Sequence, residues 1–402
     1  MADTDGPSRR QVLAGGATAL AAMAGCLQQD DDGGPPEKLD PTGGFEIETV
    51  ADGFSNPWGL AFLPDSGLLV TEREREGAGR LSLVDRETGD RETVAGVPDV
   101  FTAGQGGMLD VTTHPSFPDD AWVYLTYSAA NADGESATQV GRGRLDRGEP
   151  RLDSFETLHT AEPFVDSDAH FGSRAVFGPD GRLYVTTGDR QFKDFDPDHV
   201  SQDRSNDLGA TLRLAPDGSI PPDNPFVDEA GASDAIYSYG HRNSQGMTVH
   251  PETGELWQSE HGEQDGDEIN VIEAGGNYGW PVAHTGCTYG SDDPVGDRPE
   301  DRADVVNPVH YWECNTGGFP PAGATFYDGE AFPDWRGDLL VGGLASRYLA
   351  RFDVDGHDVE EIGPLLVDEN WRIRDVAVAP DTGYLYVAVD DANAPVVRLV
   401  PA

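Results

Sequence analysis

Residues 259–270, SEHGEQDGDEIN, place five carboxylates and one imidazole within twelve positions. In a protein of average composition, this density of oxygen and nitrogen donors would indicate a metal site. The whole chain, however, carries 73 Asp and Glu against 27 Lys and Arg, for a formal net charge of -46. Acidic clusters therefore arise from composition alone, and the side chains of Glu260, Glu263 and Asp265 are expected to belong to an acidic surface.

Several other polar residues stand in settings that suit binding or catalysis. His170 stands just before a predicted strand in HFGSRAVFGPDG, and Arg242 and Asn243 lie in SYGHRNSQGM. Gln105 lies in AGQGGMLDV, where flanking glycines let a flat ligand approach the backbone. Taken alone, a loop histidine is more often solvated or structural than catalytic.

Two arginines near the C-terminus form a further candidate binding group. Arg372 and Arg374, in WRIRDV, share one face of a predicted strand. Two guanidinium groups placed in this way could grip a ligand that carries several carboxylates. In so acidic a chain, salt bridges within the protein are the alternative explanation.

The elements that position these residues are predicted by a recurring segment. Each copy has an apolar or aromatic residue, Pro, an Asp or Gly turn, and then residues that alternate at the strand period of two. The copies are FLPDSGLLVTE, HPSFPDDAWVYLTY, FGPDGRLYVTTGD, HPETGELWQSEHG, FPDWRGDLLVGG and APDTGYLYVAVDD, beginning at Phe62, His114, Phe177, His250, Phe332 and Ala379.

Six copies predict an all-β fold, a six-bladed β-propeller with long inter-strand loops over its central channel. The spacing between copies exceeds what compact four-stranded blades need, so long loops are expected on one face. A β-sandwich or two barrels is the alternative, because strand alternation alone does not fix radial closure.

Composition also bears on partners. The chain has only two lysines, Lys38 and Lys193, and this acidic balance is typical of a halophilic, haloarchaeal-type source, in which salt screens self-repulsion. The charge argues against nucleic acid and against anionic membrane surfaces, both of which need cationic neutralisation. A small, neutral substrate is expected.

The N-terminus reads separately from the rest. Residues 1–25 resemble a twin-arginine signal, with Arg9 and Arg10 before an apolar run too short to span a bilayer, and Cys26 stands at a lipoprotein cleavage box. A buried apolar helix is the alternative. The prediction is a signal peptide at 1–25, a flexible acidic tether at 26–44 and a propeller domain at 45–402. The protein is thus expected to be exported, extracytoplasmic and anchored to the membrane only through a lipid on Cys26.

Two cysteines remain after Cys26. An extracellular setting permits a disulfide between Cys287 and Cys314, which we favour over two free thiols. Zinc is not expected from two cysteines without flanking ligand spacing.

Six ordered motifs carry a family resemblance. They are NPWGL, GQGGMLDVTTHP, HFGSRAVFGPDGRLYVTTGD, YGHRNSQGM, SEHGEQDGDEINVIEAGGNYGWP and WRIRDV, from Asn56 nearly to the C-terminus. In these the chain resembles the soluble aldose dehydrogenases that depend on pyrroloquinoline quinone (PQQ), the glucose/sorbosone dehydrogenase family. The resemblance implies a six-bladed propeller, as do the repeats.

The resemblance also implies roles for individual residues. His170 matches the general base that takes the proton of the anomeric hydroxyl, and Arg242 matches a catalytic residue that stabilises negative charge on the quinone. The positions that match cofactor contacts are Gln105, Arg242, Asn243, Asp267, Tyr289, the loop Ala322, Gly323 and Ala324, and the carboxylate-binding pair Arg372 and Arg374.

Calcium is the second implied cofactor. The carbonyls of Gly262 and Glu263 match the ligands of a catalytic Ca²⁺, while Glu268 and the carbonyl of Tyr278 match ligands of a structural Ca²⁺. The family usually has proline where this chain has Glu263, so the loop is expected to be less rigid and to carry an extra charge.

The expected function is oxidation of the anomeric carbon of an aldose sugar to a lactone, with electrons passed to an external acceptor. The alternative is a non-catalytic propeller that retains a calcium and binds a carbohydrate or a protein. A lactone-hydrolysing propeller would need a metal held by several side chains, which the motif does not provide.

Overall fold

The computed structural model describes residues 44–75 and 77–402, all within the compact unit Pro35–Ala402. The predicted signal peptide, Cys26 and all of the predicted tether except Gly44 lie outside the described residues. No helix in the described part of the chain is long and apolar enough to cross a membrane.

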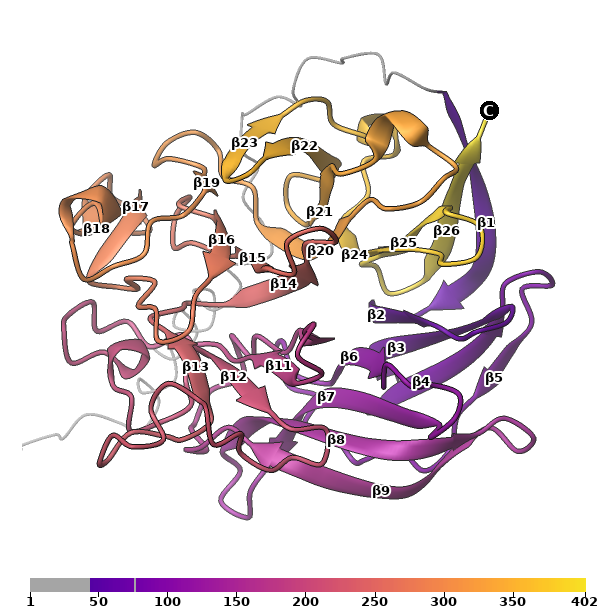
Figure 1. The fold of residues 1–402 in the computed structure, drawn as a ribbon, viewed down its shortest axis with the longest axis horizontal. Coiled ribbons are helices and arrows are strands. Elements are labelled where there is room, and N and C mark those ends of the chain that lie inside the picture. Colours follow the sequence, from indigo (N-terminus) through magenta and orange to yellow (C-terminus); the bar gives the residue numbers. More distant parts are fainter. Residues whose placement is uncertain (1–43, 76) are drawn as a thin grey trace, which may run out of the picture. The chain divides into compact units, whose positions relative to one another are not determined.

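The regular secondary structure of the described chain is almost entirely β-strand, and most strands form six four-stranded antiparallel sheets (Figure 1). In chain order the first three sheets are β2(Pro57–Phe62) β3(Gly67–Arg75) β4(Ala78–Asp85) β5(Arg91–Thr93); β6(Met108–Thr113) β7(Trp122–Ala130) β8(Ser136–Asp146) β9(Arg151–Thr160); and β10(Ala175–Phe177) β11(Leu183–Thr186) β12(Ala210–Leu214) β13(Ile236–Tyr239).

The other three sheets follow the same order except for one insertion and one exchange of a strand. They are β14(Ser244–Val249) β15(Leu256–Glu260) β16(Glu268–Ile272) β19(His310–Tyr311); β20(Pro321–Phe326) β21(Leu339–Gly343) β22(Leu349–Asp355) β23(Asp358–Glu361); and β24(Ile373–Val378) β25(Leu385–Val389) β26(Ala394–Pro401) β1(Phe45–Phe54). Within residues 44–75 and 77–402, four short 3-10 helices lie in loops: η1(Val200–Gln202), η2(Pro299–Asp301), η3(Pro333–Trp335) and η4(Val367–Glu369).

The sheets close into a ring because each packs on both of its neighbours. Six hydrophobic clusters alternate with the six sheets, one between each adjacent pair, including one that joins the last sheet to the first. Radial closure, which strand alternation could not establish, is therefore present, and the predicted six-bladed propeller is confirmed.

Strand alternation explains how one strand serves two clusters. Leu68 and Val70 of β3 pack toward the last sheet, whereas Leu69 between them packs toward the second sheet. Because successive side chains point to opposite faces, apolar residues at every position make a strand that is buried on both sides.

The predicted repeats all fall at one place in the blade. Each joins the innermost strand to the second strand, as in the turns β2–β3, β10–β11 and β24–β25. The ring itself is closed by β1, which pairs antiparallel with β26 although the two lie at opposite ends of the described chain (Figure 1).

One insertion interrupts the fourth sheet. Between β16 and β19 the chain forms a separate two-stranded sheet, β17(Ala283–Cys287) and β18(Pro294–Gly296). A disulfide joins Cys287 to Cys314, with 5.4 Å between their Cα atoms, so the bridge favoured from sequence is present.

Candidate functional site

His170 is the centre of the candidate site. It lies in the connection from β9 to β10, its side chain is only 3% exposed, and its backbone has a φ of 47°. The loop after β11 packs directly on it: a Cβ on Gly188 would come within 2.1 Å of the His170 carbonyl oxygen, so only glycine fits there.

Asp189 orients the imidazole. Its Oδ1 lies 2.6 Å from Nδ1 of His170, and its Oδ2 accepts a hydrogen bond from Nε1 of Trp280 at 2.8 Å. On the other side, Oε1 of Gln105 accepts from the His170 backbone N–H at 2.9 Å. Because an ionised carboxylate only accepts, Nδ1 carries the proton and Nε2 presents its lone pair.

Electrostatics keep this imidazole neutral. Burial and the nearby Arg242 guanidinium lower the pKa of His170 below its usual value, and they outweigh the opposing effect of Asp189. Burial opposes ionisation of Asp189, but His170 and Arg242 nevertheless hold its pKa below the usual value. The pair is therefore a neutral base held by an ionised carboxylate.

Arg242 lies beside this pair in the connection from β13 to β14. Its backbone carbonyl accepts from Asp189 N–H at 2.8 Å, and its Nη2 donates to Oε2 of Glu263 at 2.7 Å. The next residue, Asn243, accepts from Gly172 N–H through Oδ1 at 3.1 Å and from His261 N–H through its carbonyl at 3.2 Å.

Two glutamates expected on the surface are buried. Glu260 binds His241 Nδ1 at 2.8 Å and also accepts from the Arg242 backbone N–H, while the Glu263 side chain is only 2% exposed. The expectation of an acidic surface was therefore wrong for both. Glu260 accepts hydrogen bonds from buried donors, and Glu263 pairs with a cation. Amino-acid composition does not show such neighbours.

Arg372 and Arg374 converge on one carboxylate. Asp390 Oδ2 lies 2.8 Å from Arg374 Nη2 and 3.3 Å from Arg372 Nη2. Burial would raise the pKa of Asp390, but the arginines outweigh it and hold that pKa below its usual range. Both arginines therefore form the salt bridges that the sequence left as an alternative to ligand binding. Nε of Arg374 is nevertheless buried with no hydrogen-bond partner among the described residues.

The predicted calcium loop is a tight turn between β15 and β16. Asp267 holds it closed by accepting from Gly262 N–H at 2.9 Å and from Phe319 N–H at 2.7 Å. Burial raises the pKa of Asp267 to about 6, although these donors oppose the shift. A Cβ on Gly262 would lie 2.0 Å from the Asp265 carbonyl oxygen, so the turn requires glycine there.

Three predicted contact residues occupy a strand and not a loop. Ala322, Gly323 and Ala324 lie within β20, which corrects the loop expected from sequence. The Ala322 carbonyl accepts from Ser259 Oγ at 2.8 Å, and Ala324 lines a channel cavity of about 370 Å³ to which every innermost strand contributes.

The remaining predicted residues divide between the site and its surroundings. Tyr289 is 47% exposed, and its ring lies 5.5 Å from Lys193 Nζ. Glu268 lies 3.3 Å from His284 Nδ1, and the Tyr278 hydroxyl, which is not the predicted ligand atom, donates to the Val271 carbonyl at 2.6 Å. In residues 44–75 and 77–402, no three His, Cys, Asp or Glu side chains form a group that could hold a metal.

Asp189, Asp390 and Lys193 were missed from sequence. Both aspartates lie just after the second strand of a blade. In two other blades a buried glutamate lies near the end of the second strand, Glu72 in β3 and Glu260 in β15. A carboxylate at the end of the recurring strand was therefore the available signal. Lys193 gave no signal beyond its rarity.

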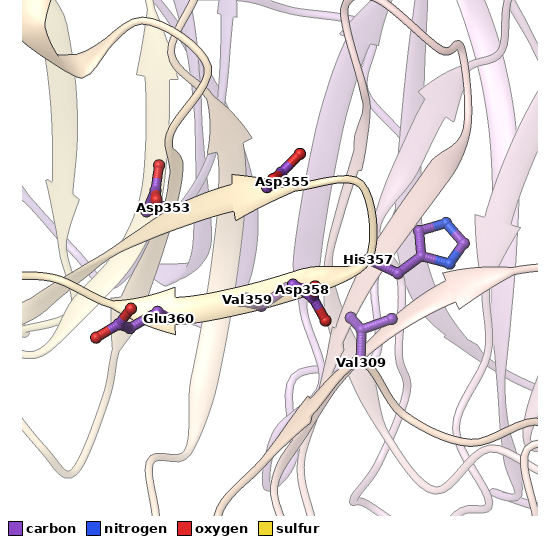
Figure 2. Close-up of a pocket in the computed structure, with 7 residues that line it drawn as sticks. All are labelled: Val309, Asp353, Asp355, His357, Asp358, Val359 and Glu360. Carbon is purple, nitrogen blue, oxygen red and sulfur yellow. The ribbon is translucent and has the colours of Figure 1, made fainter.

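A second cavity, of about 400 Å³, is unrelated to these residues. It is lined by Val309, Asp353, Asp355, His357, Asp358, Val359 and Glu360 at the β22–β23 hairpin. Figure 2 shows the carboxylates of Asp353, Asp355 and Glu360 pointing apart instead of converging, so this hairpin offers no coordination site.

Family comparison agrees with the fold and with the motifs. A model of the family described as Glucose / Sorbosone dehydrogenase matches residues 54–398. The chain belongs to the glucose/sorbosone dehydrogenase family. This confirms the resemblance inferred from the six motifs.

Two relatives match this glucose/sorbosone dehydrogenase family member over most of its length. The chain is 38% identical over 356 residues to an aldose sugar dehydrogenase of Escherichia coli, and the match covers 88% of this chain and 92% of the relative. It is 28% identical over 420 residues to quinoprotein glucose dehydrogenase B of Acinetobacter calcoaceticus, covering 87% and 86%. These relatives are oxidoreductases that act on sugars.

Solved structures of family members share the fold. The apo-form of the soluble aldose sugar dehydrogenase from Escherichia coli has a TM-score of 0.82 and 37% identity, covering 89% of this chain and 100% of that one. The PQQ-bound form of the aldose sugar dehydrogenase from Streptomyces coelicolor has a TM-score of 0.72 and 29% identity, covering 91% and 99%.

Proposed function

We propose that this protein oxidises the anomeric carbon of aldose sugars to lactones, using PQQ and Ca²⁺, and passes the electrons to an external acceptor. The observation that carries the proposal is the buried pair of His170 and Asp189, 2.6 Å apart beside Arg242. A neutral base, an orienting carboxylate and a cation are the groups that an alcohol oxidation needs around its substrate.

Unpartnered buried nitrogen atoms support quinone binding. Arg242 Nε and Arg374 Nε are both buried without a hydrogen-bond partner among the described residues, so two guanidinium N–H groups lack an acceptor. Such groups are costly unless a ligand satisfies them. A flat anion with carbonyl and carboxylate oxygens fits this donor set, and a structure of PQQ-bound aldose sugar dehydrogenase from Streptomyces coelicolor is among the similar ones.

We assign the following roles to residues of the chain. Nε2 of His170 takes the proton of the anomeric hydroxyl, and Asp189 keeps the imidazole in the required tautomer and stabilises its charged form. Arg242, Asn243, Gln105 and the Arg372–Arg374 pair hold the cofactor. When bound, PQQ supplies the acceptor for the hydride of the anomeric carbon.

Calcium would lie at the turn after β15. The carbonyl oxygens of Gly262 and Glu263 are hard donors of the kind that Ca²⁺ takes, and Asp267 fixes the turn that presents them. There the ion would act as a Lewis acid. Glu268 and the Tyr278 carbonyl are proposed for a second, structural Ca²⁺.

The setting of the enzyme is proposed from the sequence. A twin-arginine signal and Cys26 would export the protein and tether it by a lipid, and the net charge of -46 would suit a halophilic host.

A paired assay tests the catalytic proposal. Apoprotein in concentrated salt is supplied with PQQ and Ca²⁺, and sugar-dependent dye reduction is compared between wild type and His170→Ala. We expect the variant to bind quinone within about threefold of wild type and to lose turnover by about 10²–10⁴-fold, the usual contribution of a general base. Equal turnover in the two proteins would refute the role of His170.

A further inference from the structure

Lys193 makes an ion pair inside the candidate site. Its Nζ lies 2.6 Å from Oε1 of Glu263 and also binds Oε2 of the same carboxylate. The lysine side chain is 45% exposed, whereas the glutamate is 2% exposed. Lys193 is the only lysine in the part of the chain that the structure describes, and it lies at this site.

The pair joins two loops that come from different blades. Lys193 belongs to the long connection from β11 to β12, which also carries Asp189, and Glu263 belongs to the turn between β15 and β16. The ammonium also lies 5.7 Å from the Phe195 ring centroid and 5.5 Å from that of Tyr289. Both distances are within the range of cation–π attraction, which adds to the ion pair in holding the ammonium.

Glu263 has two cationic partners, and this determines the local charge. Its Oε2 also lies 2.7 Å from Nη2 of Arg242. With Arg242 alone, the glutamate would cancel the guanidinium charge. With Lys193 included, these three side chains sum to one positive charge, which offsets the ionised Asp189 beside Arg242.

We propose that Lys193 is a positioning residue for Arg242. By sharing the Glu263 carboxylate it ties the β11–β12 loop to the β15–β16 turn, and its charge makes the site one unit more positive toward the bound anion than Arg242, Glu263 and Asp189 would be without it. The inference deepens the proposed function and rests on it for the identity of that anion, which is PQQ.

Equilibrium binding of PQQ to the apoprotein, at saturating Ca²⁺ and followed by cofactor absorbance, tests the charge role. Lys193→Met should weaken binding about tenfold because the site loses one positive charge in front of an anion, whereas Lys193→Arg should stay within about threefold of wild type. Glu263→Gln added to Lys193→Met restores the net charge, and its amide oxygen still accepts from Arg242. The double variant should therefore bind within about threefold of wild type.

The matched control is Arg204→Met, which removes one cation from an exposed ion pair with Glu229. It should change PQQ affinity less than about twofold because solvent screens that charge. A double variant as weak as Lys193→Met would overturn the proposal, since it would mean that Lys193 acts on the ligand directly. An unchanged Lys193→Met would overturn it as well.

Hydrogen exchange of the apoprotein tests the tie without any cofactor. Lys193→Met should speed amide exchange in residues 188–196 and 261–267, and Lys193→Arg should not. Unchanged exchange in both segments would refute the tie. If wild-type protein with Ca²⁺ bound no PQQ, the proposed function and the charge role would fail together, and the exchange result would still decide whether Lys193 joins the two loops.

Discussion

His170, the proposed base, is set apart from an ordinary histidine by its burial and by its contact with Asp189. The imidazole is held on both sides, by Asp189 at Nδ1 and by Gln105 at its backbone N–H. Because burial and Arg242 lower its pKa, the lone pair on Nε2 is available at neutral pH. A solvated histidine would be partly protonated there.

This predicts the pH dependence of turnover. In the proposed mechanism activity requires neutral His170, so kcat/KM should fall only at pH values below the usual histidine pKa of about 6.5. Asp189 raises the pKa of His170, and Asp189→Asn removes that effect, so the acid limb should move to lower pH while kcat falls through poorer orientation. A pH–rate profile of both proteins measures this. A limb that moves to higher pH in the variant would contradict the assignment of His170 as the base.

Sequence reasoning worked for residues with a motif and failed for their partners. His170, Arg242 and Gln105 were named because their segments are distinctive, and the structure brings them together. Asp189 and Asp390 were missed because one acid among 73 carries no signal by type. Glu263 was misread for the same reason, since only the fold shows that Arg242 and Lys193 stand beside it.

The innermost strands hold a buried charge cluster. Arg174 immediately precedes β10. Its Nη1 lies 2.9 Å from Asp110 Oδ1 and 3.1 Å from Asp375 Oδ1, so one cation pairs with two carboxylates from different blades. Burial raises the pKa of Asp110 to about 7, and it also raises that of Asp375. The cluster joins β6, β10 and β24 across the central channel.

Arg174→Met should therefore destabilise the protein by about 3–5 kcal/mol, because it leaves two buried carboxylates unpaired. The loss should be smaller at pH 5 than at pH 8. A group whose folded pKa lies above its unfolded value loses stability as pH rises, and both aspartates are of this kind. Denaturant unfolding at the two pH values measures the loss of stability.

The control is Arg204→Met, which removes one partner of the exposed pair with Glu229 and should cost less than about 1 kcal/mol. Equal losses in the two variants would contradict the role of Arg174 in pairing the two buried carboxylates.

The disulfide supports the turn after β15. Cys287 exchanges two backbone hydrogen bonds with Gln264, each 3.0 Å, next to the proposed calcium ligands. Replacing Cys287 and Cys314 with serine should lower the free energy of unfolding by about 2–4 kcal/mol. It should also raise the Ca²⁺ concentration needed for PQQ binding. Denaturant melts and a Ca²⁺ titration measure both effects, and an unchanged unfolding midpoint would contradict this role.

At the scale of the whole molecule, repeats predicted the blades but not their closure. The six copies fall at the inner hairpins of six sheets because that turn has the strictest chemistry, namely Pro, Asp and Gly before a doubly buried strand. Closure depends on β1 pairing with β26, far apart in sequence, and on clusters between neighbouring sheets. No local pattern encodes these contacts, so the family resemblance and the structure had to supply them.

The net charge predicts a salt requirement. With a formal charge of -46 and few cations to pair with it, self-repulsion should be severe when the Debye length is about 10 Å at 0.1 M salt and weak when it is about 3 Å at 1 M. The melting temperature should rise steadily with KCl over that range. A melting temperature that does not change with salt would contradict a halophilic adaptation.

The most direct test of the proposed function is anaerobic reduction of the bound cofactor by sugar, without any external acceptor. Wild-type protein loaded with PQQ and Ca²⁺ is mixed with a panel of aldoses, and the absorbance of the quinone is recorded. We predict that at least one aldose reduces it stoichiometrically and that His170→Ala, equally loaded, stays oxidised. Loaded wild-type protein that no aldose reduces would contradict the account.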